Sequence, residues 1–331
     1  MSPASTTARR VSTALRQGWR WFTWPVWNRR RRRLRAPVRA ILPLVITFLA
    51  LAAVQSAVRA QFDHPVVEPV EAVGLSVVLV GGVLVSARLI DRRPVAEYGL
   101  SFDRRWWRSV AVGGAIATAV NAGSSAAMLA TGWASVAGFA EGSGSLPFWP
   151  AMVVVFAYLA VAASWEEFVL RGTMLKNIAE GSDGYVPRWA AVGFAVLVSS
   201  LVFAFLHGGK VTHIGQYGYY VVAGVVLGVA YVLTGELALS IGFHACYNFT
   251  MSAVFGLGVT QQTPELVVLD IVGPTRWVGE EGLVHLLFAV LGGVCLIAYV
   301  RHRDGSLRLD GGVTRWTPIF DRETAHESSR E

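Results

Sequence analysis

The sequence predicts an all-α protein, a polytopic bundle of about eight transmembrane helices. Hydrophobic residues form 53% of the 331 residues and charged residues only 15%, which is too little charge to cover a soluble domain, where about 25% is usual. The mean hydropathy is +0.47, and the apolar residues lie in runs about 20 residues long, enough to cross a bilayer. The net charge of +7 comes from short basic segments beside those runs, which is typical of membrane topology. We therefore expect the lipid bilayer as a partner and no nucleic acid.

The chain begins with a basic polar tail, residues 1–37, which includes the arginine run 29–33. No small-residue cleavage site follows the first apolar run, because Arg59 interrupts the pattern. We therefore expect a retained first span and no cleaved signal peptide. The predicted spans are 38–58, 71–90, 109–130, 149–171, 189–207, 217–233, 236–256 and 283–300. They divide the chain into N-terminal spans (38–130), a central core (149–256), a last span (283–300) and a polar C-terminal tail (301–331).

The distribution of basic residues predicts the orientation in the membrane. The loops at 61–70 and 131–148 contain no lysine or arginine. The second loop, the fourth loop and the segment after the last span are basic, through Arg92, Arg93, Arg104, Arg105, Arg108, Lys176, Arg188, Arg301, Arg303 and Arg308. Basic loops stay in the cytoplasm. The pattern therefore predicts a multi-pass protein of the cell membrane with both termini in the cytoplasm.

The two cysteines, Cys246 and Cys295, both lie inside apolar runs. Their spacing provides neither a disulfide framework nor a CxxC metal site. We expect them to be packing residues.

Ionisable side chains inside apolar spans are costly, so they indicate function unless a helix end explains them. The first group is Glu166, Glu167 and Arg171, near the end of the fourth run. Residues 167 and 171 are four apart and share a helix face, so we expect an ion pair between them. Glu166 points about 100° away and lacks that partner, which suits a general base. The alternative is a helix end that emerges into water, where charges are ordinary.

Two further polar groups lie on later runs. Phe203 and His207 share a face at the end of the fifth run, where a lone histidine also suits ordinary packing. His244 and Asn248 are four apart in the seventh run, so both side chains project the same way. Their donors suit a developing oxyanion, and the alternative is hydrogen bonding between helices. The remaining histidines, which we expect to be structural or solvent-facing, are His64, His213, His285 and His302.

Together the three groups resemble the CPBP family (CaaX protease and bacteriocin-processing), also called Abi. Its pattern is EExxxR, FxxxH and HxxxN, each on its own transmembrane helix. This sequence has Glu166-Glu167-x-x-x-Arg171, then Phe203-x-x-x-His207, then His244-x-x-x-Asn248. The resemblance covers roughly residues 149–256. It implies an intramembrane endopeptidase that is similar to CaaX prenyl proteases and acts on a membrane-associated protein or peptide.

The resemblance also implies the role of each residue. Glu166 and His207 activate a water, and His244 and Asn248 stabilise the oxyanion. Glu167, Arg171 and Phe203 support the site. No cofactor is then needed. A zinc-dependent metalloprotease is the alternative, because Glu166, His207 and His244 would make a two-histidine, one-carboxylate ligand set.

Two questions stay open at this point. The predicted topology puts Glu166 near the cytoplasmic end of its span and His207 near the far end of the next span, although one water must reach both. Either the helix ends are misjudged or His207 lies below a re-entrant segment at 208–216. A non-enzymatic membrane scaffold or immunity protein is the remaining alternative function.

Overall fold

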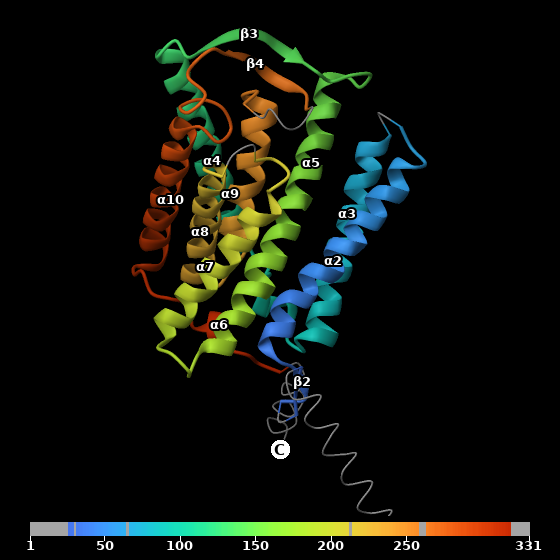
Figure 1. Ribbon diagram of the computed structural model, residues 1–331, viewed down its shortest axis with the longest axis vertical. Helices are drawn as coiled ribbons and strands as arrows, with labels where there is room; N and C mark the ends of the chain where they lie inside the picture. Colours follow the sequence, from blue (N-terminus) through green and yellow to red (C-terminus); the bar gives the residue numbers. More distant parts are fainter. Residues whose placement is uncertain (1–25, 30, 64–65, 212–213, 258–262, 319–331) are drawn as a thin grey trace, which may run out of the picture.

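The computed structural model describes residues 26–29, 31–63, 66–211, 214–257 and 263–318. These residues form an all-α bundle with two small two-stranded sheets (Figure 1). The α-helices are α2 (Ala36–Arg59), α3 (Val67–Val85), α4 (Arg104–Ala130), α5 (Phe148–Glu167), α6 (Lys176–Ser182), α7 (Arg188–Leu206), α8 (Gln216–Thr234), α9 (Ala238–Phe249) and α10 (Leu283–Asp304). The π-helical segments are η1 (Ser86–Ile90), η3 (Phe168–Leu175) and η4 (Thr250–Val254), and η2 (Val95–Tyr98) and η5 (Gly311–Thr314) are short 3-10 helices. The strands are β1 (Trp27–Asn28), β2 (Arg33–Leu34), β3 (Ala134–Glu141) and β4 (Glu265–Ile271).

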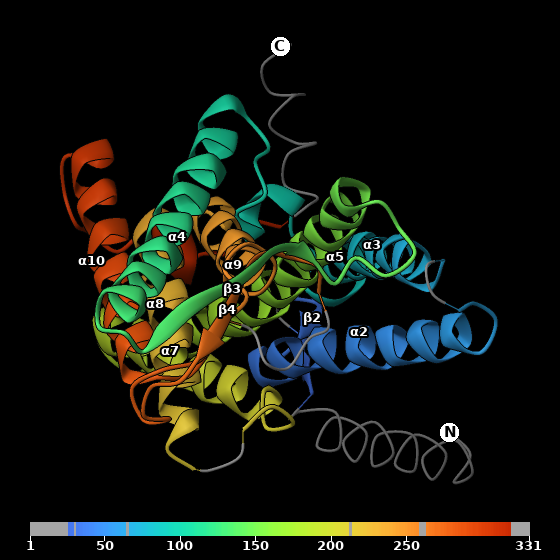
Figure 2. The same cartoon turned by 90° about the horizontal axis from the view of Figure 1, so that it is seen from above.

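The predicted fold class is confirmed, and the chain is an integral membrane protein. In the described part of the chain, seven helices are long and apolar enough to cross a membrane. The predicted span 236–256 corresponds to α9, which has only 12 residues and is continued by the five residues of η4. Seen from above, α9 lies among α4, α5 and α8 (Figure 2). It is therefore an inner helix, covered by longer ones.

Glycine allows α9 to approach α4 closely. A Cβ atom on Gly242 would clash with the Val110 carbonyl oxygen, and one on Gly113 would clash with the Leu239 carbonyl oxygen. Small residues at helix interfaces let backbones come together in membranes, where close packing and not water exclusion drives association. This contact fixes α9, and with it His244 and Asn248, in the centre of the bundle.

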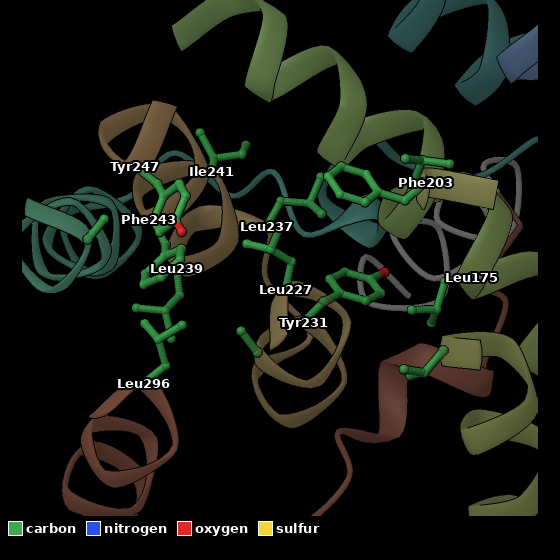
Figure 3. Close-up of a cluster of buried hydrophobic side chains, with 14 of the residues drawn as sticks. Leu175, Phe203, Leu227, Tyr231, Leu237, Leu239, Ile241, Phe243, Tyr247 and Leu296 are labelled. Carbon is green, nitrogen blue, oxygen red and sulfur yellow. The ribbon is translucent and has the colours of Figure 1, made fainter. Parts of the chain in front are cut away.

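Apolar side chains fill the space between α8, α9 and α10. Figure 3 shows Leu227 and Tyr231 of α8, Leu239 and Phe243 of α9, and Leu296 of α10 in this cluster. Leu239 and Tyr231 have no exposed surface. The described core is thus packed solidly on this side of α9.

The fourth span is longer than predicted. The segments α5, η3 and α6 form one continuous helix over Phe148–Ser182, 35 residues long, where the hydrophobic run predicted an end at 171. Lys176, which was predicted to lie in the following loop, is buried in the helix together with Arg171. This extension places Glu166 near the middle of the helix and not at its end.

The end of the bundle at which α2, α4 and α7 begin is held by a buried ionic cluster, and we call it the basic end. Glu180 of α6 accepts hydrogen bonds from Arg33, Arg39 and Arg93. Burial lowers the pKa of the Arg33 guanidinium to about 10, so this group is still charged at neutral pH. Arg33 belongs to the segment that composition predicted to be a polar tail, and pairing with Glu180 explains why it is buried.

The C-terminal segment 305–318 folds back to the same cluster. The Arg33 guanidinium lies 3.9 Å from the centroid of the Trp316 ring, and the indole nitrogen of Trp316 donates to the Asp91 carbonyl at 3.0 Å. A cation over an aromatic face is attracted by the ring quadrupole. Both ends of the described chain are therefore anchored at the basic end.

Removing Glu180 should destabilise the protein strongly. Glu180→Ala leaves three buried arginines without their shared acceptor, and breaking a buried pair costs about 3–5 kcal/mol. Unfolding of the purified protein in detergent measures the loss. Arg105→Ala is the matched control, because the Arg105 side chain is 59% exposed and pairs with Asp304, which keeps Arg303 as a second partner, and exposed pairs contribute about 0–1 kcal/mol. Equal losses in the two variants would contradict the role given to the buried cluster.

The opposite end carries an antiparallel ribbon made of β3 and β4, and we call it the ribbon end. The register runs from Ala134 opposite Ile271 to Glu141 opposite Glu265. The ribbon connects the tops of α4 and α5 to the segment after α9 (Figure 1). Gly256, with φ +55°, allows the chain to turn from η4 toward β4.

Candidate active site

Glu167 and Arg171 form the ion pair that their spacing predicts. The Arg171 Nη1 atom donates to Glu167 Oε1 at 2.9 Å, and both side chains are fully buried. Arg171 Nη2 also donates to the Gly224 carbonyl of α8 at 3.2 Å. The pair therefore links α5 to α8, and two buried charges satisfy one another.

Glu167 has a second partner that spacing along one helix does not reveal. Its Oε1 atom lies 2.8 Å from Nδ1 of His244 on α9. A carboxylate oxygen only accepts, so the Nδ1 atom of His244 carries a proton. Glu167 thus orients the His244 ring, and the Nε2 atom of this ring faces Glu166, whose Oε2 atom is 3.9 Å away.

Glu166 lacks a partner for one of its oxygens in the described part of the chain. Its Oε2 atom is buried and accepts no hydrogen bond there, although the side chain as a whole is 22% exposed. The neighbouring Glu167 is occupied by Arg171 and His244. Two adjacent glutamates thus have different environments, as their positions on the helix predict.

Phe203 of α7 lies at the centre of the site. Its ring centroid is 4.4 Å from the His207 ring and 5.8 Å from the His244 ring, and the Arg171 guanidinium lies 4.9 Å from the same centroid. The Phe203 carbonyl oxygen is 2.8 Å from His207 Nδ1. Because a carbonyl only accepts, Nδ1 of His207 is the protonated nitrogen, and in the neutral ring Nε2 is left as an acceptor.

A cavity lies beside these residues. His207, His244 and Asn248 all line it, with Phe203 and Tyr220. About 50 Å³ is open to the centres of water molecules, and a single water needs roughly 10–15 Å³ by the same measure. The structure therefore brings residues of the second and third motifs to one cavity that is large enough for water, with Glu166 adjacent through His244.

The longer fourth helix resolves the difference in depth between Glu166 and His207. The segment 183–187 is a short turn, so α6 and α7 run antiparallel from the basic end. Glu166 lies about 24 Å of helix from Ser182, and His207 about 28 Å from Arg188, at 1.5 Å per residue. The two side chains therefore reach similar heights, and no re-entrant segment is required.

Some residues of the site were not predicted from the sequence. The Tyr220 ring stacks on His207 with centroids 4.4 Å apart, and its hydroxyl donates to Glu281 at 2.9 Å. Tyr219 and Tyr247 share a hydrogen bond of 2.7 Å beside the cavity. Two tyrosines side by side near the start of an apolar run were the available signal, but aromatic residues are common near membrane interfaces.

The other histidines have varied positions. His285 is fully buried, and its Nδ1 atom lies 2.9 Å from the Ser124 hydroxyl. His302 is exposed at the basic end. His64 and His213 lie outside the described residues.

A bound metal ion needs several suitable side chains that lie close together. Among the described residues, no three histidine, cysteine, aspartate or glutamate side chains are grouped closely enough to hold a metal ion. Glu166, His207 and His244 are therefore not gathered as a ligand set in this arrangement. The hydrogen bond from Nδ1 of His244 to Glu167 leaves Nε2 free, and a histidine that binds a metal usually has such a carboxylate partner. Zinc thus stays the alternative to the mechanism proposed below, which uses no metal.

The fold and the site define a class: a multi-pass membrane protein in which three apolar helices carry polar residues to an internal cavity. Residues 147–250 match the family model described as type II CAAX prenyl endopeptidase, Rce1-like. All three motifs lie within the matched segment. The resemblance to the CPBP family is thereby confirmed over residues 147–250. No curated protein and no solved structure matched the chain significantly.

Proposed function

We propose that the chain is an intramembrane endopeptidase, similar to CaaX prenyl proteases, that hydrolyses a peptide bond with a water activated by Glu166 and His207. The observation that supports this most directly is the arrangement of α5, α7 and α9. Each helix is otherwise apolar, yet each contributes polar side chains to the same place. Such residues are expensive in a membrane and are retained for function.

In this mechanism the Glu166 carboxylate takes a proton from the water while Nε2 of His207 accepts its second hydrogen and orients it. The water oxygen adds to the carbonyl carbon of the substrate. The resulting oxyanion accepts hydrogen bonds from the Asn248 amide and, when its ring is protonated, from Nε2 of His244. The carbon–nitrogen bond then breaks, and Glu166 returns the proton to the amine that leaves.

The supporting residues have geometric roles. Glu167 orients His244, and Arg171 balances the charge of Glu167. Phe203 and Tyr220 hold the His207 ring between them. Such preorganisation is valuable, because the donors need not reorient while the oxyanion forms.

His207→Ala should lower turnover by about 10²–10⁴-fold, the usual contribution of a positioned acid or base. The assay uses purified protein in liposomes, a library of single-span test proteins, and mass spectrometry in water labelled with ¹⁸O. Hydrolysis places one labelled oxygen in each new carboxyl terminus. His302→Ala is the matched control and should keep full activity, since His302 is exposed far from the cavity.

Two results would contradict the proposal. The first is that the wild type cleaves none of the test proteins, which would favour a scaffold or immunity protein. The second is that His207→Ala cleaves them as fast as the wild type.

A further inference from the structure

The two ends of the bundle differ sharply in charge. The connections at the ribbon end, 60–66, 131–147, 207–215 and 255–282, have Lys210 and Arg276 as their only lysine and arginine. Their acidic residues are Asp63, Glu141, Glu265, Asp270, Glu280 and Glu281. Arginine and lysine gather instead at the basic end, where both described termini also lie. Since basic segments stay in the cytoplasm, the ribbon end faces away from it.

Two charged residues from loops of the ribbon end line the cavity. Lys210, in the connection between α7 and α8, and Glu280, in the connection between β4 and α10, both line it. Met251 of η4 lines it at the same end. The polar approach to His207 and Asn248 is therefore built from loops of the ribbon end.

Toward the basic end the cavity is closed by packed apolar side chains. Leu227 of α8 and Phe243 of α9 line the cavity on this side. Further from the cavity, Leu239 lies between Phe243 and Leu296 of α10, Tyr231 points toward Leu175 of η3, and neither has exposed surface (Figure 3). An extended peptide that arrived from the basic end would have to displace this core, which costs several kcal/mol for each large side chain.

From this geometry, and resting on the proposed function, we infer that the scissile bond enters from the extracytoplasmic side. The substrate class is then a membrane-anchored protein that presents an extended juxtamembrane segment outside the cytoplasm. A prenylated C-terminal CaaX motif lies in the cytoplasm, on the side where the cavity is closed. The inference therefore predicts that such tails are poor substrates of this chain.

The decisive experiment uses two single-span test proteins expressed in cells with this protein. Both carry the same cleavable segment, and only the flanking arginines are moved, so that the segment lies outside in one protein and in the cytoplasm in the other. We expect cleavage of the outside version and at least about a tenfold loss for the inverted one. His207→Ala should cleave neither.

The outcomes separate the inference from the function on which it rests. Preferential cleavage of the cytoplasmic version, abolished by His207→Ala, would overturn the inference and leave the protease standing. Cleavage of neither version by the wild type would overturn both.

An orientation test that needs no substrate accompanies this experiment. Ser145→Cys places a thiol on an exposed position of the ribbon end, and Arg308→Cys places one on an exposed position of the basic end. A membrane-impermeant thiol reagent should label the Ser145 variant in intact cells and the Arg308 variant only after lysis. The wild type gives the background from Cys246 and Cys295. The reverse labelling pattern would overturn the inference whatever the protease assay shows.

Discussion

Glu166→Gln should lower turnover by about 10²–10⁴-fold and leave the stability of the fold unchanged. The substitution removes the base that accepts the proton from water, and general-base catalysis contributes this much. The carboxylate Oε2 has no hydrogen-bond partner in the described structure, so the change breaks no hydrogen bond of that atom. Turnover with a cleaved test protein and unfolding in detergent are measured on the same preparations.

Glu167→Gln is the matched variant, and it should behave differently. Its carboxylate is shared by Arg171 and His244, at 2.9 and 2.8 Å. Neutralising it leaves Arg171 as a buried charge without a counterion, which costs about 3–5 kcal/mol. We therefore expect low folded yield and a lower unfolding midpoint. Equal activity losses with normal yields for both variants would refute the different roles assigned to the two glutamates.

Local spacing predicted much of this site, because residues four apart on a helix share a face whatever the helix packs against. The Glu167–Arg171 pair followed from that rule. The same rule could not reveal that Glu167 also contacts His244, which is 77 positions away. That contact depends on how closely α9 approaches its neighbours, and Gly242 and Gly113 determine this through tertiary packing.

The boundary of the fourth span shows a second limit of sequence patterns. Hydropathy ends the span at Arg171 and assigns Lys176 to a loop, yet both lie inside a continuous helix. Each is buried with a partner: Glu167 for Arg171, and the Gly312 carbonyl for Lys176. A hydropathy average counts the charge of a residue but takes no account of the partner that it is buried with. The average therefore ends the span too early. The depth of Glu166 relative to His207 could therefore be understood only from the structure.

The same limit applies to the tails. Composition describes 1–37 and 301–331 as polar, which is correct, but Arg33 and Trp316 meet over a buried glutamate at the basic end. Pairing across the chain converted polar segments into fixed structure. Long-range pairs of this kind carry no periodic signal in the sequence.

Asn248→Ala should lower turnover by about 10²–10³-fold without any change in metal content. Asn248 lines the cavity beside His244, and in the proposed mechanism its amide donates to the oxyanion. Loss of one such donor has this cost because the remaining groups cannot move to replace it. Turnover and metal content are measured in parallel on purified wild type and variant.

A zinc mechanism predicts a different set of results for the same preparations. Zinc would be present in a one-to-one ratio and lost in His244→Ala, which removes a ligand. A tight chelator would inactivate the wild type, and added zinc would restore it. Asn248→Ala would then have a minor effect, because an amide is a poor zinc ligand. Stoichiometric zinc together with chelator inactivation and zinc rescue would overturn the water mechanism based on Glu166 and His207. The resemblance of residues 147–250 to membrane proteases would remain, since it depends on the helices that carry the motifs and not on how the water is activated.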